Sequence, residues 1–270
     1  RGWSKPHLVS YMESHDEERM MYRNLQFGNS SNTSHNVRDL NTALKRVELC
    51  AGFFLSAPGP KMIWQFGELG YDFSINRCVD GTISNDCRLS NKPIRWDYLT
   101  VVQRKRLYDI FASVNKLRFH PWYKDVFIAN NINIARSLNG AFKSMTIRSA
   151  TDSSMLCVVG NFDVTAQTAV FAFPAGGTWY DYLNGSTFTA TGTAQNLTLQ
   201  PGEFHIYLNR NLTNAVVTST GGTDTPGNQL IASVFPNPAT VTSVLEIEVP
   251  QTGNVQAELF NAAGQKMTTV

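Results

Sequence analysis

Residues 37–66 read VRDLNTALKRVELCAGFFLSAPGPKMIWQF, which joins a helical pattern to a short apolar run. The first part places apolar side chains three or four positions apart, the spacing of one face of an α-helix. The Pro-Gly-Pro sequence at 58–60 ends this predicted helix, because proline lacks the backbone N–H that a helix needs. The run KMIWQF at 61–66 has the length of a buried strand. The helical face consists of Val37, Leu40, Leu44, Val47, Ala51 and Phe54.

The same succession of elements occurs on either side of this stretch. Residues 8–12, LVSYM, form an apolar run, and a polar loop rich in Asn and Ser separates it from the helix. A long polar loop after residue 66 leads into a second helical pattern, which His120 and Pro121 end. Two rounds of strand, loop and helix predict parallel βα units, in which functional residues lie where strands end. The second helical face consists of Leu107, Ile110, Phe111, Val114 and Leu117.

The second half of the chain changes to short segments of alternating apolar and polar character. Asn139-Gly140 and Asn184-Gly185 are strong signals for tight hairpin turns, so these segments predict antiparallel strands. The predicted parts are an α/β part at residues 1–125, an antiparallel β domain at 126–210, a linker rich in Thr, Gly and Asn at 211–228 and a further β module at 229–270.

The composition bounds the class of protein. The 270 residues are 42% hydrophobic and 16% charged, with a formal net charge of +2. Because there is no dense run of Lys and Arg, nothing points to nucleic acid or to an anionic membrane as a partner. No apolar run approaches the roughly 20 residues that span a bilayer. The sequence begins with Arg1 and ends inside a predicted strand, so we interpret it as part of a longer protein.

The four cysteines fall into two kinds. Cys50 lies in a helical pattern and Cys157 in a strand pattern, so both are predicted to be buried thiols. Cys78 and Cys87 bracket a polar loop, CVDGTISNDC, and neither neighbours a second cysteine or histidine at the spacing of a zinc site. A local disulfide between these two is expected if the protein is secreted, and two free thiols otherwise.

The first apolar run ends in a cluster of titratable residues, YMESHDEERM, at 11–20. His15 and Asp16 directly follow the predicted strand. They form either a catalytic acid or charge-stabilising pair, or an aspartate that caps the loop beside a surface histidine. The other carboxylates are expected in solvent or in ion pairs with Arg19; these are Glu13, Glu17 and Glu18.

The second predicted strand also ends in polar residues, GELGYD, at 67–72. Glu68 either lines the site at the end of the first strand or is a structural carboxylate that pairs with an arginine. The sequence contains no Ser-His-Asp signature, P-loop or GxGxxG motif. The loop that follows carries side chains that either reach a ligand or form a polar surface: Asp72, Arg88 and Arg95.

Four segments, in the correct order, resemble glycoside hydrolase family 13, the α-amylase family. HLVSYMESHDEER (7–19) resembles the motif on the seventh barrel strand, and GPKMIWQFGELGYD (59–72) resembles the eighth strand and its loop. LYDIFASVNKLRFHPWY (107–123) is similar to the last barrel helix, and 126–210, with GTWYDYLNG, to the C-terminal β domain. The resemblance implies the last two βα units of a (β/α)8 barrel followed by an antiparallel β-sandwich.

The resemblance also implies roles for the candidate residues. Asp16 corresponds to the third family carboxylate, which binds sugar hydroxyls and stabilises the transition state. His15 corresponds to the histidine that hydrogen-bonds the same sugar, although Ser14 stands where the family usually has Asn. Glu68 and Arg95 are further candidates for binding substrate. The implied activity is retaining hydrolysis of α-1,4-glucans, such as starch and glycogen, through an oxocarbenium-like transition state.

The family's nucleophile Asp and general acid Glu lie on earlier strands, and no segment here matches them. We therefore expect the full-length protein, called the parent below, to be the enzyme and this chain alone to be inactive. The alternatives are a glucan branching enzyme that uses the same residues and a noncatalytic starch-binding surface protein. No cofactor or metal is expected in this chain, while the resemblance allows a calcium site in the parent.

The tail carries a second resemblance. VFPNPAT (234–240) and AELFNAAGQKM (257–267) are similar to the start of a type IX secretion system C-terminal sorting domain. This implies a secreted or surface-attached protein of Bacteroidetes-type bacteria, with the secretion machinery as a partner of residues 229–270. The alternative for these residues is a carbohydrate-binding β module.

Overall fold

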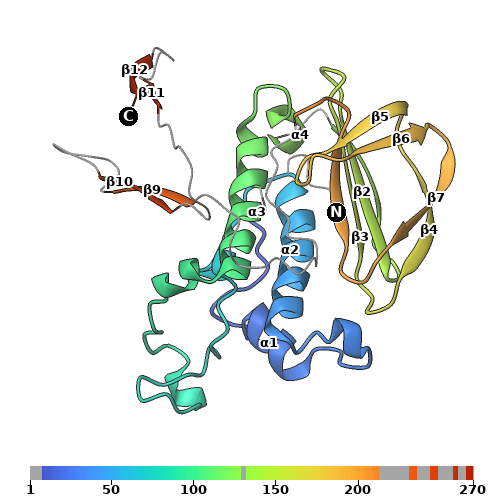
Figure 1. Ribbon diagram of the computed structural model, residues 1–270. Helices are drawn as coiled ribbons and strands as arrows, with labels where there is room; N and C mark the ends of the chain where they lie inside the picture. Colours follow the sequence, from blue (N-terminus) through green and yellow to red (C-terminus); the bar gives the residue numbers. More distant parts are fainter. Residues whose placement is uncertain are drawn as a thin grey trace. The chain divides into compact units, whose positions relative to one another are not determined.

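The computed structural model describes residues 8–128, 132–212, 231–235, 244–248, 258–260 and 266–269. The chain forms two compact units, Arg1–Thr218 and Ser219–Val270 (Figure 1). Their boundary falls inside the predicted linker, of which residues 213–228 lie outside the described residues. None of the helices in the described ranges combines the length and the apolar character that crossing a bilayer requires.

Two long helices dominate the first half of unit one and lie side by side (Figure 1). Helix α2 (Leu40–Ser56) ends just before the Pro-Gly-Pro sequence, and α3 (Val102–Phe119) ends just before His120, as the sequence predicts. Every member of the second predicted apolar face is buried, in a core cluster that also contains residues of α2 and the sheet. The shorter helices are α1 (Met20–Phe27) and α4 (Lys124–Ile128), with short 3-10 turns at Thr33–His35, Gly67–Leu69, Asn85–Cys87 and Trp96–Thr100.

The second half of unit one is an antiparallel β-sandwich. A six-stranded sheet has the order β1-β2-β3-β8-β5-β6, and β4 pairs with β7 in a second sheet. Gly140 and Gly185 adopt positive φ in the two predicted hairpin turns, which explains why glycine follows asparagine there. The strands are β1 (Ile132–Ser137), β2 (Phe142–Ser149), β3 (Met155–Asn161), β4 (Gln167–Ala172), β5 (Gly176–Asp181), β6 (Thr187–Thr191), β7 (Ala194–Leu199) and β8 (Phe204–Leu208).

The centre of the six-stranded sheet is buried on both faces, while its edge strand β1 is mostly exposed. Side chains alternate along β3, so Leu156 and Val158 join the core that α2 and α3 cover, while Cys157 and Val159 join the core under the β4–β7 sheet. The helices therefore share a hydrophobic core with the β domain. The predicted boundary at 125/126 also falls within α4, so the α/β part and the β domain meet without a break.

Helix α2 lies directly on the sheet at a glycine. A Cβ atom added to Gly52 would lie 2.5 Å from Cε2 of Phe204 on β8, closer than two carbon atoms can approach without a shift. The absence of a side chain at this position lets the helix axis approach the strand. This close contact with β8 fixes the position of α2 on the sheet of the β domain.

The two predicted strands at 8–12 and 61–66 are wrong as extended strands. The structure reduces them to one parallel bridge between Ser10 and Lys61, with hydrogen bonds from Ser10 N to Pro60 O (3.1 Å) and from Met62 N to Ser10 O (2.9 Å). The parallel direction agrees with the prediction. Parallel strands depend on neighbours on both edges and cover on both faces, and within the described residues neither segment pairs with another strand.

Three further elements escaped prediction. Helix α1 occupies residues that were expected to form a loop, and β6 and β7 fall in a Thr-rich stretch with little apolar alternation.

In unit two, the described residues form two antiparallel pairs, which agrees with the predicted β character of the tail. The pairs are β9 (Ile231–Phe235) with β10 (Val244–Glu248), and β11 (Glu258–Phe260) with β12 (Lys266–Thr269).

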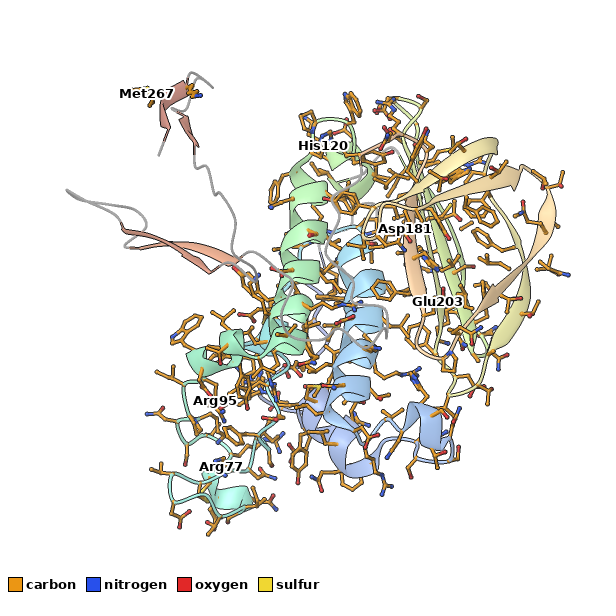
Figure 2. The ribbon with its side chains drawn as sticks, in the orientation of Figure 1. Arg77, Arg95, His120, Asp181, Glu203 and Met267 are labelled. Atoms are coloured by element: carbon orange, nitrogen blue, oxygen red, sulfur yellow. A yellow bond between two sulfur atoms is a disulfide. The ribbon has the colours of Figure 1, made fainter. Side chains whose placement is uncertain are left out.

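A partly buried histidine joins two segments of the six-stranded sheet. His205 Nδ1 lies 2.5 Å from Asp181 Oδ2, and its Nε2 lies 3.0 Å from Glu203 Oε1. Figure 2 labels both carboxylate residues within the β domain. Burial by itself lowers the pKa of His205, but the hydrogen bonds to Asp181 and Glu203 outweigh it and raise the pKa to about 9. Asp181 and Glu203 therefore stabilise the protonated, imidazolium form of His205.

This raised pKa predicts a pH-dependent stability. The folded pKa lies above the unfolded value of 6.5, so the stabilisation is complete below pH 6.5 and is lost as the pH rises to about 9. The free energy of unfolding of the wild type should exceed that of His205→Gln by at most about 3 kcal/mol at pH 6. The difference should shrink toward zero by pH 10 in urea titrations. A difference that stays constant over this range would contradict the prediction.

Candidate functional site

A buried arginine joins the ends of the two predicted strands. The side chain of Arg19 is 1% exposed, and its Nη1 lies 2.9 Å from Glu13 Oε1 and donates to the main-chain oxygen of Gln65 at 2.9 Å. The guanidinium lies 3.3 Å from the ring centroid of Trp64 and 4.7 Å from that of Tyr71. A planar cation that stacks on aromatic rings and pairs with a carboxylate fixes one segment against the other.

Glu13 also organises the start of α1. Its second carboxylate oxygen accepts a hydrogen bond from the backbone N–H of Met20 at 2.8 Å, at the helix N-terminus, where a negative charge is favourable. Burial lowers the pKa of Arg19, and the charge of Glu13 opposes this shift. Arg19 Nη2 is buried and has no hydrogen-bond partner in the part of the chain that the structure describes.

His15 and Asp16 lie at the tip of the segment that this ion pair anchors. Their side chains are 66% and 69% exposed, and His15 Nε2 lies 3.5 Å from Asp16 Oδ2. The Ser14 hydroxyl accepts a hydrogen bond from the backbone N–H of Asp16 at 3.2 Å, and it donates to Glu17. The carboxylate of Asp16 is thus held on a defined turn while its oxygens remain accessible to a ligand.

Glu68 lies on the 3-10 turn after the second predicted strand. Burial raises the pKa of Glu68, while the positive charge of Arg19 opposes the shift and the carboxylate of Glu13 adds to it. Phe66, which precedes this turn, adopts a left-handed backbone with φ of 59°, a sparsely populated conformation for a side chain of its size. The structure therefore places Glu68 in the electrostatic field of Arg19, beside the segment that carries His15 and Asp16.

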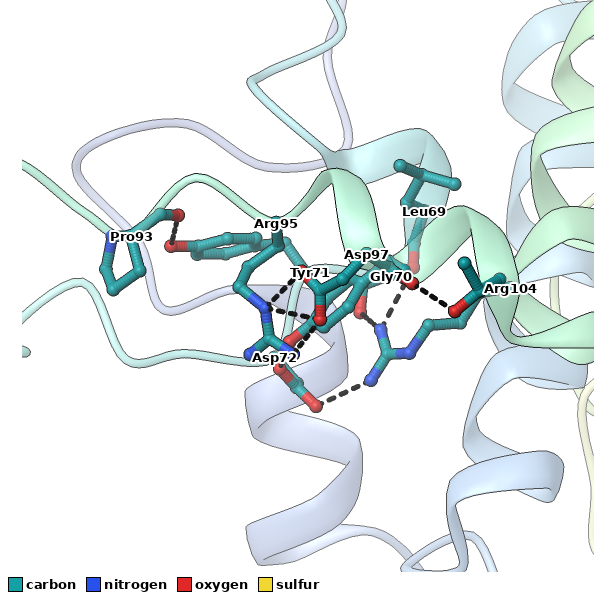
Figure 3. A network of polar contacts seen from close by, with 10 residues as sticks. Leu69, Gly70, Tyr71, Asp72, Pro93, Arg95, Asp97 and Arg104 are labelled. Carbon is teal, nitrogen blue, oxygen red and sulfur yellow. Dashed lines mark hydrogen bonds and ion pairs between the residues drawn. The ribbon is translucent and has the colours of Figure 1, made fainter.

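Arg95 belongs to a different cluster, shown in Figure 3. It forms an ion pair with Asp97 at 2.6 Å, and its guanidinium lies 4.1 Å from the ring centroid of Tyr98. Arg104 lies 3.7 Å from the same ring centroid and pairs with Asp72 at 2.7 Å. An open groove of about 460 Å³ borders this cluster. No hydrogen bond or ion pair within the described residues joins Arg95 to His15 or Asp16.

Cys78 and Cys87 form a disulfide in the loop between Asp72 and Arg95 in the sequence, with a Cα separation of 5.0 Å. Cys157 is a buried free thiol, and Cys50 is a partly buried one. Across the described ranges, no group of three or more His, Cys, Asp or Glu side chains is placed to hold a metal ion.

The aromatic partners of Arg19 were not predicted from the sequence. An ion pair with Arg19 was one predicted alternative for the neighbouring glutamates, and the structure forms this pair with Glu13. Glu18 instead accepts hydrogen bonds from the hydroxyl of Ser74 and the N–H of Ile75. Trp64 and Tyr71 belong to another segment, and no periodic pattern in the sequence links them to Arg19.

Comparisons with solved structures show where this fold recurs. The chain resembles a variant of the protein AmyP solved in complex with maltotriose, with a TM-score of 0.52 and 16% identity over 73% of this chain and 40% of that one. It also resembles a pullulanase from Anoxybacillus sp., with a TM-score of 0.50 and 10% identity over 76% of this chain and 28% of that one. No protein-family model matches the sequence, and no curated protein matches it significantly.

These neighbours are enzymes of glycoside hydrolase family 13. At this identity the likeness shows the fold, which is the mixed α and antiparallel β architecture of the C-terminal part of such enzymes. The matched region spans less than half of either neighbour.

The buried ion pair generates a stability prediction. Arg19→Met leaves the carboxylate of Glu13 buried without its partner, so the free energy of unfolding should fall by about 3–5 kcal/mol. The exposed Arg23 on α1 provides a matched control, and Arg23→Met should change the stability by no more than about 0.5 kcal/mol. Urea unfolding of the two variants and the wild type measures both values. Equal stability of Arg19→Met and Arg23→Met would show that the pair does not hold the two segments together.

Proposed function

We propose that this chain is a fragment of a secreted α-amylase-like enzyme that cleaves α-1,4-glucans with retention of configuration. One observation carries the proposal: His15 and Asp16 are adjacent and accessible on a turn that Glu13 and Arg19 anchor. The resemblance of the surrounding sequence to the seventh-strand motif and the fold shared with AmyP support it. The structure of AmyP contains maltotriose, which is the substrate class proposed here.

In this proposal Asp16 stabilises charge while the glycosidic bond breaks. Its carboxylate accepts hydrogen bonds from sugar hydroxyls, and these bonds tighten as the ring distorts toward the oxocarbenium-like transition state. His15 donates a further hydrogen bond to the same sugar. A retaining reaction also needs a nucleophile and a general acid about 5–5.5 Å apart, and we assign both to the part of the parent outside this chain. Glu68 and Arg95 are the remaining substrate-binding candidates.

The barrel in this proposal would also account for the exposed apolar run at 8–12. Leu8, Val9 and Tyr11 are 65%, 52% and 48% exposed, which is unusual for an apolar segment beside a parallel bridge. Barrel strands are buried on both faces, so neighbouring strands of the parent would cover these side chains. A calcium site in the parent remains part of the proposal and involves no residue named here.

Kinetics of the parent test the role of Asp16. Asp16→Asn keeps the shape of the side chain and removes its charge, so kcat on soluble starch should fall by about 10²–10³. His15→Ala should cost less, because a neutral hydrogen bond is weaker than a charged one. Arg23→Met, at an exposed position on α1, is the control and should retain activity. Full activity of Asp16→Asn would mean that the chemistry lies elsewhere.

The products distinguish hydrolysis from branching, which uses the same residues with a sugar hydroxyl in place of water. Release of reducing ends from starch indicates hydrolysis, and new branch points without reducing ends indicate transfer. The 270-residue chain by itself should release no sugar, because it lacks the proposed nucleophile and acid.

Secretion is proposed from the sequence of the tail. Deletion of residues 230–270 from the parent should block export through the type IX machinery and leave activity in cell lysates, because unit two is a separate compact unit. Activity in the culture medium and in the lysate measures the distribution. Normal secretion of the truncated protein would exclude the sorting role and favour a carbohydrate-binding module.

A further inference from the structure

The loop at residues 74–88 is attached at both ends to the segment that carries Asp16. At its start, Glu18 accepts hydrogen bonds from the Ser74 hydroxyl at 2.6 Å and from the Ile75 N–H at 3.0 Å. At its end, Arg88 Nη2 donates to the main-chain oxygen of Asp16, and it lies 3.8 Å from the Asp16 carboxylate. Two separate attachments thus fix the loop to the turn that carries the proposed stabilising carboxylate.

The loop itself has little apolar core. Val79 and Ile83 are 85% and 56% exposed, and Ile75, at the start of the loop, is its buried aliphatic side chain. Beyond Ile75, aliphatic burial therefore contributes little to the order of the loop. Cross-loop hydrogen bonds, such as Cys78 N to Thr82 O at 2.8 Å, and the disulfide between Cys78 and Cys87 provide the order instead. Arg88 is the residue directly after the second cysteine, so the covalent closure fixes the point from which its side chain extends.

We propose that Arg88 is a positioning residue for Asp16, and that the Cys78–Cys87 disulfide holds Arg88 in place. Its effect on the reaction rests on the proposed function. The guanidinium holds the backbone of Asp16 and places a positive charge beside its carboxylate, so the oxygens keep one orientation toward the sugar. Without it the turn samples other orientations, and the hydrogen bonds of the transition state form less often.

Reduction tests the covalent part selectively. A dithiol reductant such as dithiothreitol gives two electrons and two protons to the disulfide, forming two thiols, and is oxidised to its cyclic disulfide. Cys50 and Cys157 are already free thiols, so Cys78–Cys87 is the disulfide that reduction opens in this chain. Cys78→Ser with Cys87→Ser gives the same open loop without a reductant.

The experiment compares amide hydrogen exchange and steady-state kinetics in the parent. Arg88→Met, the double serine variant and the reduced wild type should each exchange the amides of residues 14–18 at least tenfold faster. Each should also lose about tenfold in kcat with a smaller change in KM, and Arg88→Lys should recover part of both. The control is Asp86→Asn, because Asp86 is exposed on the same loop and no hydrogen bond or ion pair joins its side chain to Asp16 within the described residues. It should behave as the wild type.

The outcomes separate this inference from the proposed function. Unchanged exchange at residues 14–18 in Arg88→Met and in the reduced protein would overturn the positioning role, whatever the activity. If the parent is active and its kcat is the same in the wild type, in Arg88→Met and in the reduced protein, the positioning role of Arg88 is also overturned. If the amides of residues 14–18 exchange faster in Arg88→Met and in the reduced protein, but the parent cleaves no glucan, then Arg88 positions Asp16 and the proposed function is wrong.

Discussion

The buried guanidinium of Arg19 is the interaction on which the candidate site depends. A charge removed from water is tolerated only when it is paired, and here Glu13 and the main-chain oxygen of Gln65 provide the partners while Trp64 and Tyr71 cover the guanidinium. These partners come from two segments that, within the described residues, are paired by one parallel bridge. Lysine could not replace Arg19, because its compact ammonium would not stack in the same way.

A second constraint on unit one is the packing of its helices against the β domain. The central strands of the six-stranded sheet are buried in the core shared with the helices on one face and in the core under the β4–β7 sheet on the other, so the helices and the β domain cannot be separated without exposing a core. Helix α2 meets the sheet at Gly52, and α3 packs beside α2. The turn with Asp16 is therefore supported by a rigid frame, although its own side chains remain exposed.

The sequence predicts elements whose signal is local. The apolar face of α3 and the asparagine-glycine hairpins are of this kind, because residue spacing and positive φ are encoded within a few positions. Strand β7 has only Leu197 and Leu199 buried, so its pattern was too weak to detect. His15 and Asp16 were found through a motif. The stacking of Arg19 on Trp64 was missed, because it depends on two segments meeting in space.

A crystal structure of the parent with a bound maltooligosaccharide tests the central claim, that the turn anchored by Arg19 presents Asp16 and His15 to a glucan. The account predicts sugar hydroxyls within about 2.6–3.2 Å of the Asp16 carboxylate oxygens and the His15 ring, with the Glu13–Arg19 pair intact beneath them. An oligosaccharide bound in an active site elsewhere, with the Asp16 carboxylate facing only water, would contradict the account.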